Sequence, residues 1–216
     1  VDRIVSSSIP LALSDEATEA IQRCRAYLDK RMENEGSPIY GINTGFGSMC
    51  NTKINAHELG KLQENLVKSH ACGMGDEIPQ SVVRLMLFLK IQGLSYGHSG
   101  VQLATVQRLI DFYNNAVYPV VYSYGSLGAS GDLAPLAHLS LPLIGLGEVN
   151  YQGKRVSGTE LSAMFGWEPI ALKSKEGLAL LNGTQFMSAY ATHILNRSYA
   201  LFKKLSLVSG LSLDAY

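Results

Sequence analysis

The chain has 216 residues, enough for one domain with a substantial core or for one domain and part of a second. Eighteen basic and eighteen acidic residues leave no formal net charge, and neither sign forms a long block, which argues against steering towards nucleic acid or an anionic membrane. The three cysteines are an odd number at unrelated spacings, so a disulfide framework and a zinc site are not expected.

Apolar residues at helical spacing dominate the first part of the chain. Ser14 can cap a helix with an acidic first turn, and Gly36 is expected to end it. Asn55 and Glu58 have the spacing of a capping box, which predicts a second helix that stops before Gly73. Each segment carries one apolar face, so we interpret both as amphipathic helices that pack on a core.

The rest of the chain also has a mostly helical pattern. Further helices are expected from Pro79 and after Ser99. Residues 148–156 have the pattern of a short hairpin, and a small helix should follow from about Thr159. One long helix is predicted over residues 184–207, which contain few helix breakers. The predicted fold class is mainly α with a short β-hairpin.

The start of the chain lacks the basic region and apolar core of a secretion signal. The most apolar stretch, residues 139–147, is interrupted by Pro142 and is shorter than the roughly 20 residues that span a bilayer. We therefore expect a cytoplasmic protein with no membrane or nucleic-acid partner. The glycosylation sequons at Asn182 and Asn196 should then stay unmodified.

A loop of small residues, 125–138, has the most specific chemistry in the sequence. At its centre stands Ala129-Ser130-Gly131, a tripeptide that by itself is most often a surface turn. If the amide nitrogen of Gly131 attacks the carbonyl carbon of Ala129 and two waters leave, the backbone closes to an electrophilic 4-methylideneimidazole-5-one ring. Gly131 lacks a Cβ, so its nitrogen can fold back onto that carbonyl, and Asp132 can accept or donate protons during closure.

Two further blocks accompany this loop. Residues 40–47 read Tyr-Gly-Ile-Asn-Thr-Gly-Phe-Gly, and residues 176–185 read Glu-Gly-Leu-Ala-Leu-Leu-Asn-Gly-Thr-Gln. Residues 40–47 resemble the catalytic tyrosine loop of the aromatic amino acid ammonia-lyases, residues 125–138 resemble their cofactor-forming loop, and residues 176–185 resemble their asparagine block. The three blocks also follow one another in the same order as in that family. The resemblance is strongest to the members that act on histidine, and it covers the chain almost from end to end.

The resemblance implies a role for each block. Residues 129–131 would form the methylideneimidazolone, and Tyr40 would be the base that takes the β-proton of the substrate. Asn182 would contact the amine or carboxylate of the substrate, and Asn43 would hydrogen-bond in the same cavity. A free tyrosine has a pKa of about 10, so the site must lower the pKa of Tyr40. From the residues alone, Tyr40 is more simply an aromatic on the core and Asn182 a helix cap.

Substrate choice is predicted from Ser69 and His70. By resemblance, Ser-His is the pair of histidine-specific members, whereas Phe-Leu and His-Leu belong to members specific for phenylalanine and tyrosine. An imidazole has one donor and one acceptor nitrogen, and His70 can pair with one of them. L-Histidine is therefore the expected substrate. The alternative for His70 is a histidine that faces water at a helix end. The remaining histidines are interpreted as structural: His57, His98, His138 and His193.

Members of the family are more than twice as long, and their later parts supply an arginine for the substrate carboxylate, a glutamate and a second tyrosine. They are homotetramers with active sites between subunits. We interpret residues 1–181 as the N-terminal domain with the ring-forming loop, and residues 182–216 as the first long helix of a truncated central bundle. The full-length parent is expected to convert L-histidine to trans-urocanate and ammonia. The fragment should be inactive, with an uncyclised backbone.

Other interpretations remain open. The parent could be another ammonia-lyase or an aminomutase of the same family, or a non-catalytic helical scaffold that kept the motifs. Residues 45–47 lack the third glycine of a dinucleotide-binding loop, and residues 128–131 lack one residue of the hydrolase elbow. No group of His, Cys and carboxylate residues has the spacing of metal ligands. Neither a nucleotide cofactor nor a metal is expected.

Overall fold

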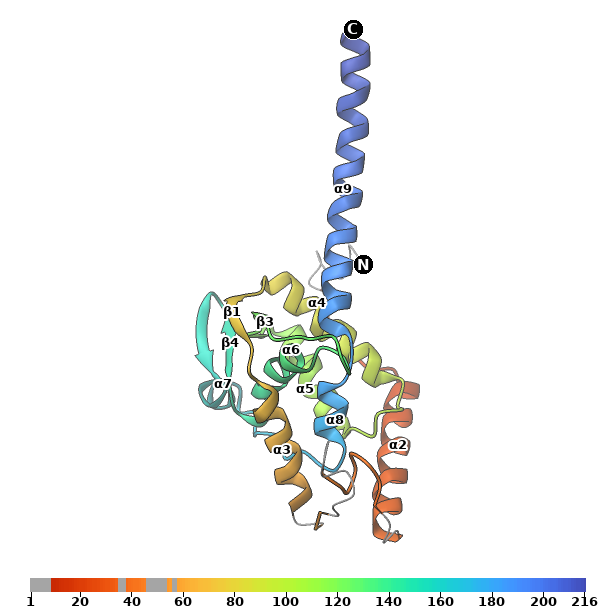
Figure 1. Ribbon diagram of the computed structural model, residues 1–216, viewed down its shortest axis with the longest axis vertical. Coiled ribbons are helices and arrows are strands. Elements are labelled where there is room, and N and C mark those ends of the chain that lie inside the picture. The colour runs from red at the N-terminus through yellow and green to blue at the C-terminus, as the bar shows by residue number, and fades with distance from the viewer. Residues whose placement is uncertain (1–8, 35–37, 46–53, 56–57) are drawn as a thin grey trace.

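The computed structural model describes residues 9–34, 38–45, 54–55 and 58–216. Most of this part of the chain is helical, as Figure 1 shows, which confirms the predicted fold class. The α-helices are α2 Asp15–Asn34, α3 Leu59–His70, α4 Gln80–Ser95, α5 Leu103–Asn114, α6 Leu133–Ser140, α7 Gly158–Phe165, α8 Glu176–Leu181 and α9 Gln185–Ala215. A 3₁₀ helix, η3 Leu141–Ile144, follows α6 directly. The strands are β1 Met74–Glu77, β2 Tyr118–Pro119, β3 Tyr122–Tyr124, β4 Glu148–Tyr151 and β5 Lys154–Ser157.

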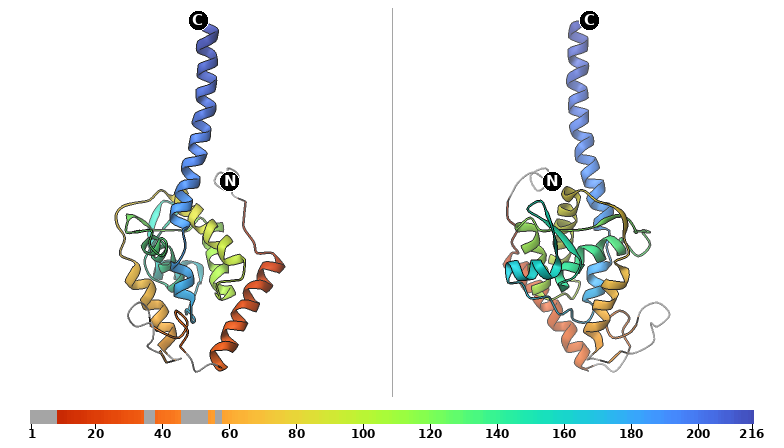
Figure 2. Two further views of the ribbon diagram at one scale, coloured as in Figure 1. Left: turned by 45° about the vertical axis from the view of Figure 1, so that its right-hand side comes forward. Right: turned by 90° about the vertical axis from the view of Figure 1, so that its left-hand side faces the viewer.

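Helix α4 lies in the middle of the core. Val82, Met86 and Lys90, spaced four residues apart, are all buried on it, and α5 and the start of α9 pack against this helix. Most of α6 is also buried, and α6 contacts both α3 and α8. Figure 2 shows α2 along the outside of this group, with the small sheets away from α2. The core is therefore formed mainly by helix–helix contacts, and the loop of residues 125–132 leads directly into it through α6.

The helix ends test the predicted caps. Ser14 accepts a hydrogen bond from the backbone N–H of Ala17 at 3.2 Å, which confirms the cap of α2. The capping box of Asn55 and Glu58 was wrong, because Glu58 itself is the N-cap of α3 and its side chain makes no capping bond. The expected end at Gly36 lies outside the described residues, and α2 extends to Asn34.

The hairpin of β4 and β5 is confirmed, with Glu148 opposite Ser157 and Tyr151 opposite Lys154. Gln152 and Gly153 both have left-handed backbones, as a tight two-residue hairpin turn requires. The other strands were not expected from the sequence. Strand β2 adds to β4 and makes a three-stranded sheet, and β1 pairs antiparallel with β3 in a separate two-stranded sheet.

Helix α9 is longer than predicted. It runs eight residues beyond Leu207, because a single glycine, Gly210, is tolerated within an otherwise helix-favouring segment. Ala189 near the start of the helix is buried, but from Ile194 onwards the large apolar side chains are exposed, by 58% at Ile194 to 79% at Leu213. Figure 1 shows the blue end of this helix extending far from the rest of the described chain.

Candidate active site

The loop between β3 and α6 has an unusual backbone at the predicted tripeptide. Ser130 has φ of 61° and Gly131 has φ of 101°, both in the left-handed region, which is uncommon for a residue with a Cβ such as serine. A Cβ on Gly131 would lie 2.4 Å from the carbonyl oxygen of Gly183. The loop therefore requires glycine at position 131, because the backbone of residue 183 passes directly against it.

Asn182 is hydrogen-bonded to the same tripeptide. Its Nδ2 donates to the carbonyl oxygen of Ser130 at 2.9 Å, although the two residues are 52 positions apart in the sequence. Next to this bond, the backbone N–H of Asp132 donates to the carbonyl oxygen of Gly183 at 2.8 Å. The segment that joins α8 to α9 is thus attached to the loop before α6 by one side-chain and one backbone hydrogen bond.

Asp132 is completely buried and links the loop to α9. One carboxylate oxygen accepts a hydrogen bond from Oγ of Ser126 at 2.9 Å, and the other accepts one from the backbone N–H of Met187 at 3.0 Å. Met187 lies in the first turn of α9, where unpaired N–H groups and the helix dipole favour a negative charge. This position explains how the fold tolerates a buried carboxylate beside the loop.

Lys90 is a buried lysine beside the loop that was not predicted from the sequence. Its side chain on α4 is 2% exposed, and its Nζ lies 3.3 Å from the carbonyl oxygen of Ala179 and 3.5 Å from that of Asn182. Burial lowers the pKa of Lys90 from 10.5 to about 7, and the nearby charge of Asp132 opposes this lowering. The signal in the sequence was a lysine at the same helical spacing as Val82 and Met86 within an apolar run.

A cavity of about 190 Å³ opens beside the tripeptide. His70 and Cys72 line it from one side, and Ala129 and Gly131 line it from the other. His70 ends α3 and is half-buried, and its Nδ1 lies 2.9 Å from the carbonyl oxygen of Leu66. The structure therefore brings His70, a predicted specificity residue, and two of the three predicted cofactor residues, Ala129 and Gly131, to one cavity.

The neighbours of His70 hold that side of the cavity. Ser69 is exposed, and its Oγ lies 3.2 Å from Nδ1 of His70 and donates to the carbonyl oxygen of Leu66. Further along, the backbone N–H of Gly73 donates to Nε2 of His138 at 3.0 Å. Burial lowers the pKa of His138, which favours the neutral imidazole that this hydrogen bond requires.

Tyr40 and Asn43 lie in a separate turn. The side chain of Tyr40 is 57% exposed, whereas Asn43 is buried and its Oδ1 accepts a hydrogen bond from the backbone N–H of Ile39 at 2.6 Å. In Figures 1 and 2 the segment 38–45 lies near the lower end of α8, away from the junction of α8 and α9. Neither residue lines the cavity beside the tripeptide.

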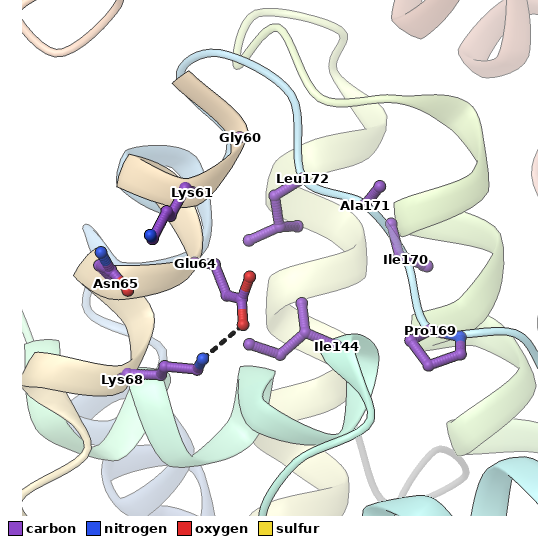
Figure 3. A pocket seen from close by; sticks show the side chains of 10 residues that line it. All are labelled: Gly60, Lys61, Glu64, Asn65, Lys68, Ile144, Pro169, Ile170, Ala171 and Leu172. Atoms are coloured by element: carbon purple, nitrogen blue, oxygen red, sulfur yellow. Dashed lines mark ion pairs between the residues drawn. The ribbon is translucent and has the colours of Figure 1, made fainter. Parts of the chain in front are cut away.

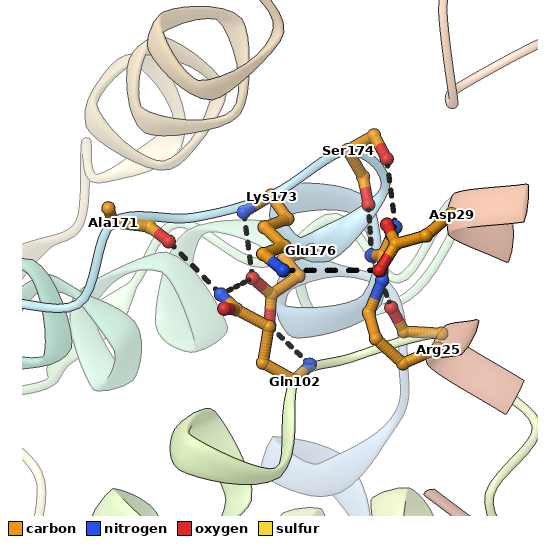
Figure 4. A network of polar contacts seen from close by, with 8 residues as sticks. Arg25, Asp29, Gln102, Ala171, Lys173, Ser174 and Glu176 are labelled. Atoms are coloured by element: carbon orange, nitrogen blue, oxygen red, sulfur yellow. Dashed lines mark hydrogen bonds and ion pairs between the residues drawn. The ribbon is translucent and has the colours of Figure 1, made fainter. Parts of the chain in front are cut away.

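The other end of α8 is fixed by a buried polar network (Figure 4). Glu176, the first residue of α8, accepts hydrogen bonds from the backbone N–H groups of Gln102 and Lys173 and from the side chains of Gln102 and Thr105, at 2.6–2.9 Å. Beside it, Arg25 of α2 donates to the carbonyl oxygen of Ser174 at 2.9 Å. The network holds the start of α8 while the loop contacts hold its end at Asn182.

A larger groove of about 630 Å³ lies elsewhere, between α3 and residues 169–172 (Figure 3). Lys61 and an ion pair between Glu64 and Lys68 are on its α3 side. None of the predicted site residues lines this groove, so its size alone does not make it the active site.

Within the described residues there is no group of three or more His, Cys, Asp or Glu side chains that could hold a metal ion. Cys24 and Cys72 are free thiols, and Cys50 lies outside the described part of the chain. Across the helices that the structure describes, none is both long enough and apolar enough to cross a membrane.

Comparison with known proteins gives one consistent family. The family model described as "Aromatic amino acid lyase" matches residues 1–216. The histidine ammonia-lyases of Legionella pneumophila strain Paris and of Vibrio cholerae are each 46% identical to the chain, over 100% and 99% of it. The match covers 42% of each relative, so the chain spans less than half of their length.

Solved structures agree with this result. The histidine ammonia-lyase of Trypanosoma cruzi is 38% identical, with a TM-score of 0.78, and the match covers 87% of this chain and 36% of that one. The phenylalanine aminomutase of Pantoea agglomerans is 31% identical, with a TM-score of 0.87, over 94% of this chain and 40% of that one. One fold is therefore shared by relatives that are named for different substrates and reactions.

Proposed function

Because the chain belongs to the aromatic amino acid lyase family, we propose that the full-length protein containing it removes ammonia from L-histidine without oxidation and releases trans-urocanate. Support comes from relatives named histidine ammonia-lyase that match the chain from end to end. Those relatives are more than twice its length, so the activity is proposed for the longer protein. The 216-residue chain by itself is proposed to be inactive.

One observation carries this proposal, namely the 2.9 Å hydrogen bond from Nδ2 of Asn182 to the carbonyl oxygen of Ser130. It joins two of the three sequence blocks at the atoms on which the chemistry depends. In the cyclised tripeptide, this carbonyl would be conjugated with the alkene derived from Ser130. A hydrogen-bond donor at its oxygen withdraws electron density from that alkene and makes it more electrophilic.

The residues at the loop fit a methylideneimidazolone built from Ala129, Ser130 and Gly131. Position 131 admits no side chain, Ser130 is held in a left-handed backbone, and Asp132 lies next to the loop with its carboxylate buried. Once formed, the ring supplies an alkene that accepts the amino group of the substrate. Asp132 would hold the end of the loop through its bonds to Ser126 and Met187, and it could accept or donate a proton during ring formation.

His70 is proposed to bind the imidazole of the substrate, with Ser69 beside it. Support comes from the position of His70 in the wall of the cavity next to Ala129 and Gly131. Nδ1 of His70 already faces the carbonyl oxygen of Leu66, so its other ring nitrogen is the one available for a ligand. A substrate with a phenyl ring would leave this nitrogen unpaired, which favours histidine.

Tyr40 is proposed as the base that takes the β-proton, and Asn43 as a further polar residue of the same cavity. Both assignments rest on the family match of residues 40–47. Because Tyr40 is exposed and lies apart from the cavity in this chain, its phenol would have to reach the substrate by a movement of its turn or through assembly of the full-length protein. Asn182 is proposed to contact the amine or carboxylate of the substrate as well as Ser130.

The wider setting follows the family. We propose a homotetramer in the cytoplasm, with residues 1–181 as the domain that carries the loop and residues 182–216 as the first long helix of a central bundle. The exposed apolar side chains of α9 support the proposed bundle, because a helix of this kind is normally covered. Among the alternatives, an aminomutase has the same fold, so only the reaction product separates the two activities.

The test uses the purified full-length protein with L-histidine. Formation of urocanate, followed by its ultraviolet absorbance, together with a mass two waters below that of the encoded chain, is the expected result. Ser130→Ala should keep the fold and lose at least about a thousandfold in kcat, because the reaction then lacks its electrophile. Substantial turnover by this variant, or a β-amino acid as the only product, would contradict the proposal.

A further inference from the structure

We propose that Lys90 is a positioning residue for ring closure, and that its buried amine holds the end of α8 so that Asn182 stays on the carbonyl of Ser130. This inference rests on the proposed function. Lys90 lies in none of the three sequence blocks that resemble the family's site. Its role follows from its contacts and from its burial.

The amine of Lys90 faces the C-terminal end of α8. The last carbonyl groups of a helix have no partner within the helix and carry the negative end of the helix dipole. Nζ of Lys90 lies 3.3 Å from the carbonyl oxygen of Ala179 and 3.5 Å from that of Asn182. Both distances are at the long end for hydrogen bonds, and both acceptors belong to the turn that presents Asn182.

A lysine at this position needs a reason to be there, because its burial is unfavourable. Lys90 is 2% exposed, and removing an amine from water without full compensation costs free energy. An apolar residue would fill the same space in α4 at no such cost. The low pKa of about 7 agrees with incomplete compensation by the two carbonyls and the charge of Asp132. Packing alone therefore does not account for a lysine at position 90.

The contacts of Lys90 continue into the loop. Asn182 is held through its backbone carbonyl by Lys90, and it holds the tripeptide through its side chain. The next residue, Gly183, accepts a hydrogen bond from the N–H of Asp132 and lies against Gly131. A shift of the end of α8 would therefore move both contacts to the tripeptide at once.

Ring closure is sensitive to such a shift. The nitrogen of Gly131 bonds to the carbonyl carbon of Ala129, whose oxygen leaves as water with the protons from the nitrogens of Gly131 and Ser130. Oγ of Ser130 leaves as a second water with its own proton and the proton from Cα of Ser130. No oxidant or other reactant is needed. The step requires the nitrogen and the carbon in contact, and a displacement of about 1 Å can slow such a reaction a hundredfold.

The experiment compares ring content in full-length protein carrying Lys90→Met, Lys90→Gln or Lys90→Arg. Intact mass separates the closed chain from the open one, because the closed chain is lighter by two waters. We expect Lys90→Met, which keeps the stem but has no donor, to lower the closed fraction at a fixed time after refolding by about tenfold or more. Lys90→Arg, which keeps donors for both carbonyls, should restore most of it.

Lys61→Met is the matched control, because it makes the same change at an exposed lysine on α3. It should leave the closed fraction unchanged. Circular dichroism and gel filtration identify the variants that fold. If Lys90→Met does not fold, Lys90→Gln is compared with Lys61→Met; its amide nitrogen ends one bond short of the position of Nζ, so it should lose the contacts with the two carbonyls and also lower the closed fraction. A purely structural role would lower stability without lowering the closed fraction of the folded protein.

The outcomes separate this inference from the proposed function. A wild-type protein with no mass loss contradicts the proposed function itself. The role of Lys90 alone is overturned if the wild-type protein contains the ring and a folded Lys90→Met or Lys90→Gln variant forms the ring as fast and as completely as the wild-type protein. Failure of all three Lys90 variants to fold would also overturn it, because the lysine would then serve the fold and not the loop.

Discussion

Gly131 and Gly128 both have left-handed backbones, but only Gly131 faces a close neighbour. A Cβ at 131 would lie 2.4 Å from the carbonyl oxygen of Gly183, whereas one at 128 would meet nothing within 4 Å. We predict that Gly131→Ala lowers the free energy of unfolding by about 3 kcal/mol or more, from strain and overlap together. It should also prevent ring closure in the full-length protein, as measured by intact mass.

Gly128→Ala is the control for backbone strain alone. It should cost only about 1 kcal/mol, because the left-handed backbone is the only penalty there. Equal losses in the two variants, measured by urea unfolding, would mean that the contact with Gly183 has no influence on stability.

His70 decides substrate preference if it binds the imidazole. We predict that His70→Phe in the full-length protein lowers kcat/KM for L-histidine by about a hundredfold, because one nitrogen of the substrate then stays unpaired in the cavity. The loss for L-phenylalanine should be much smaller. His193→Phe, at a histidine of α9 that does not line this cavity, makes the same change as a control. Parallel losses for both substrates after His70→Phe would argue against recognition by His70.

At the scale of residues, the sequence was informative where a residue type is specific to the chemistry. Ser130, Gly131 and Asn182 were predicted as one group, and the hydrogen bond from Asn182 to Ser130 places them in contact. Lys90 was not predicted, because its partners are backbone carbonyls 89 and 92 residues away, and a backbone acceptor has no residue type to recognise. The separation of Tyr40 from the cavity could not be predicted either, since it depends on tertiary packing.

Among the elements, α7 has the most complete local signal for a helix start. Oγ of Ser157 accepts a hydrogen bond from the backbone N–H of Glu160 at 3.2 Å, and the carboxylate of Glu160 accepts one from the N–H of Ser157 at 2.9 Å. The bond from the N–H of Ser157, together with a second bond to the same carboxylate from Oγ of Ser157 at 2.7 Å, lowers the pKa of Glu160. We predict that Ser157→Ala lowers the free energy of unfolding of the chain by about 1 kcal/mol, measured in urea.

Ser206→Ala makes the same change in the middle of α9, where Oγ only bonds back to the carbonyl oxygen of Phe202. It should leave stability unchanged or raise it slightly, because such a bond competes with the helix and alanine has the higher helix propensity. A similar loss for both serines would show that the capping geometry of α7 contributes nothing.

The elements themselves were predictable to different degrees. Helices α4 and α5 have clear apolar stripes, and the hairpin has a turn with a glycine, so each could be located from local sequence. Strands β1 and β3 are four and three residues long, and they pair across 45 residues or more, so no local pattern identifies them. The capping box of α7 was overlooked, although Ser157 and Glu160 have the required spacing.

For the whole molecule, Lys90 makes stability depend on pH. In the unfolded chain its pKa is near the ordinary 10.5, whereas in the folded chain it is about 7. At a pH between these two pKa values the unfolded state binds more protons than the folded state, so the free energy of unfolding rises with pH. Below pH 7 the amine is charged in both states, and the full cost of burying that charge lowers the stability of the fold. Lys90→Met removes this contribution.

The measurement is the difference in free energy of unfolding between the chain and Lys90→Met at several pH values. Taking the difference cancels groups that titrate equally in both proteins. We predict that the free energy of unfolding of the unmodified chain, minus that of Lys90→Met, rises by roughly 1 kcal/mol per pH unit between pH 7 and 10.5. A difference that is flat over this range would mean that the amine of Lys90 keeps an ordinary pKa in the fold.

The bond between Asp132 and the first turn of α9 has a mechanical consequence. Met187 is near one end of a helix of 31 residues whose remainder extends from the body of the chain. A small tilt of so long a helix about its buried end would displace the N–H of Met187 and with it the carboxylate of Asp132. Through the hydrogen bond from Ser126 to Asp132, the displacement would reach the start of the loop. A protein surface that packs along the far end of this helix would therefore also influence how firmly the loop is held. In the proposed homotetramer, subunit assembly and ring closure would then be coupled.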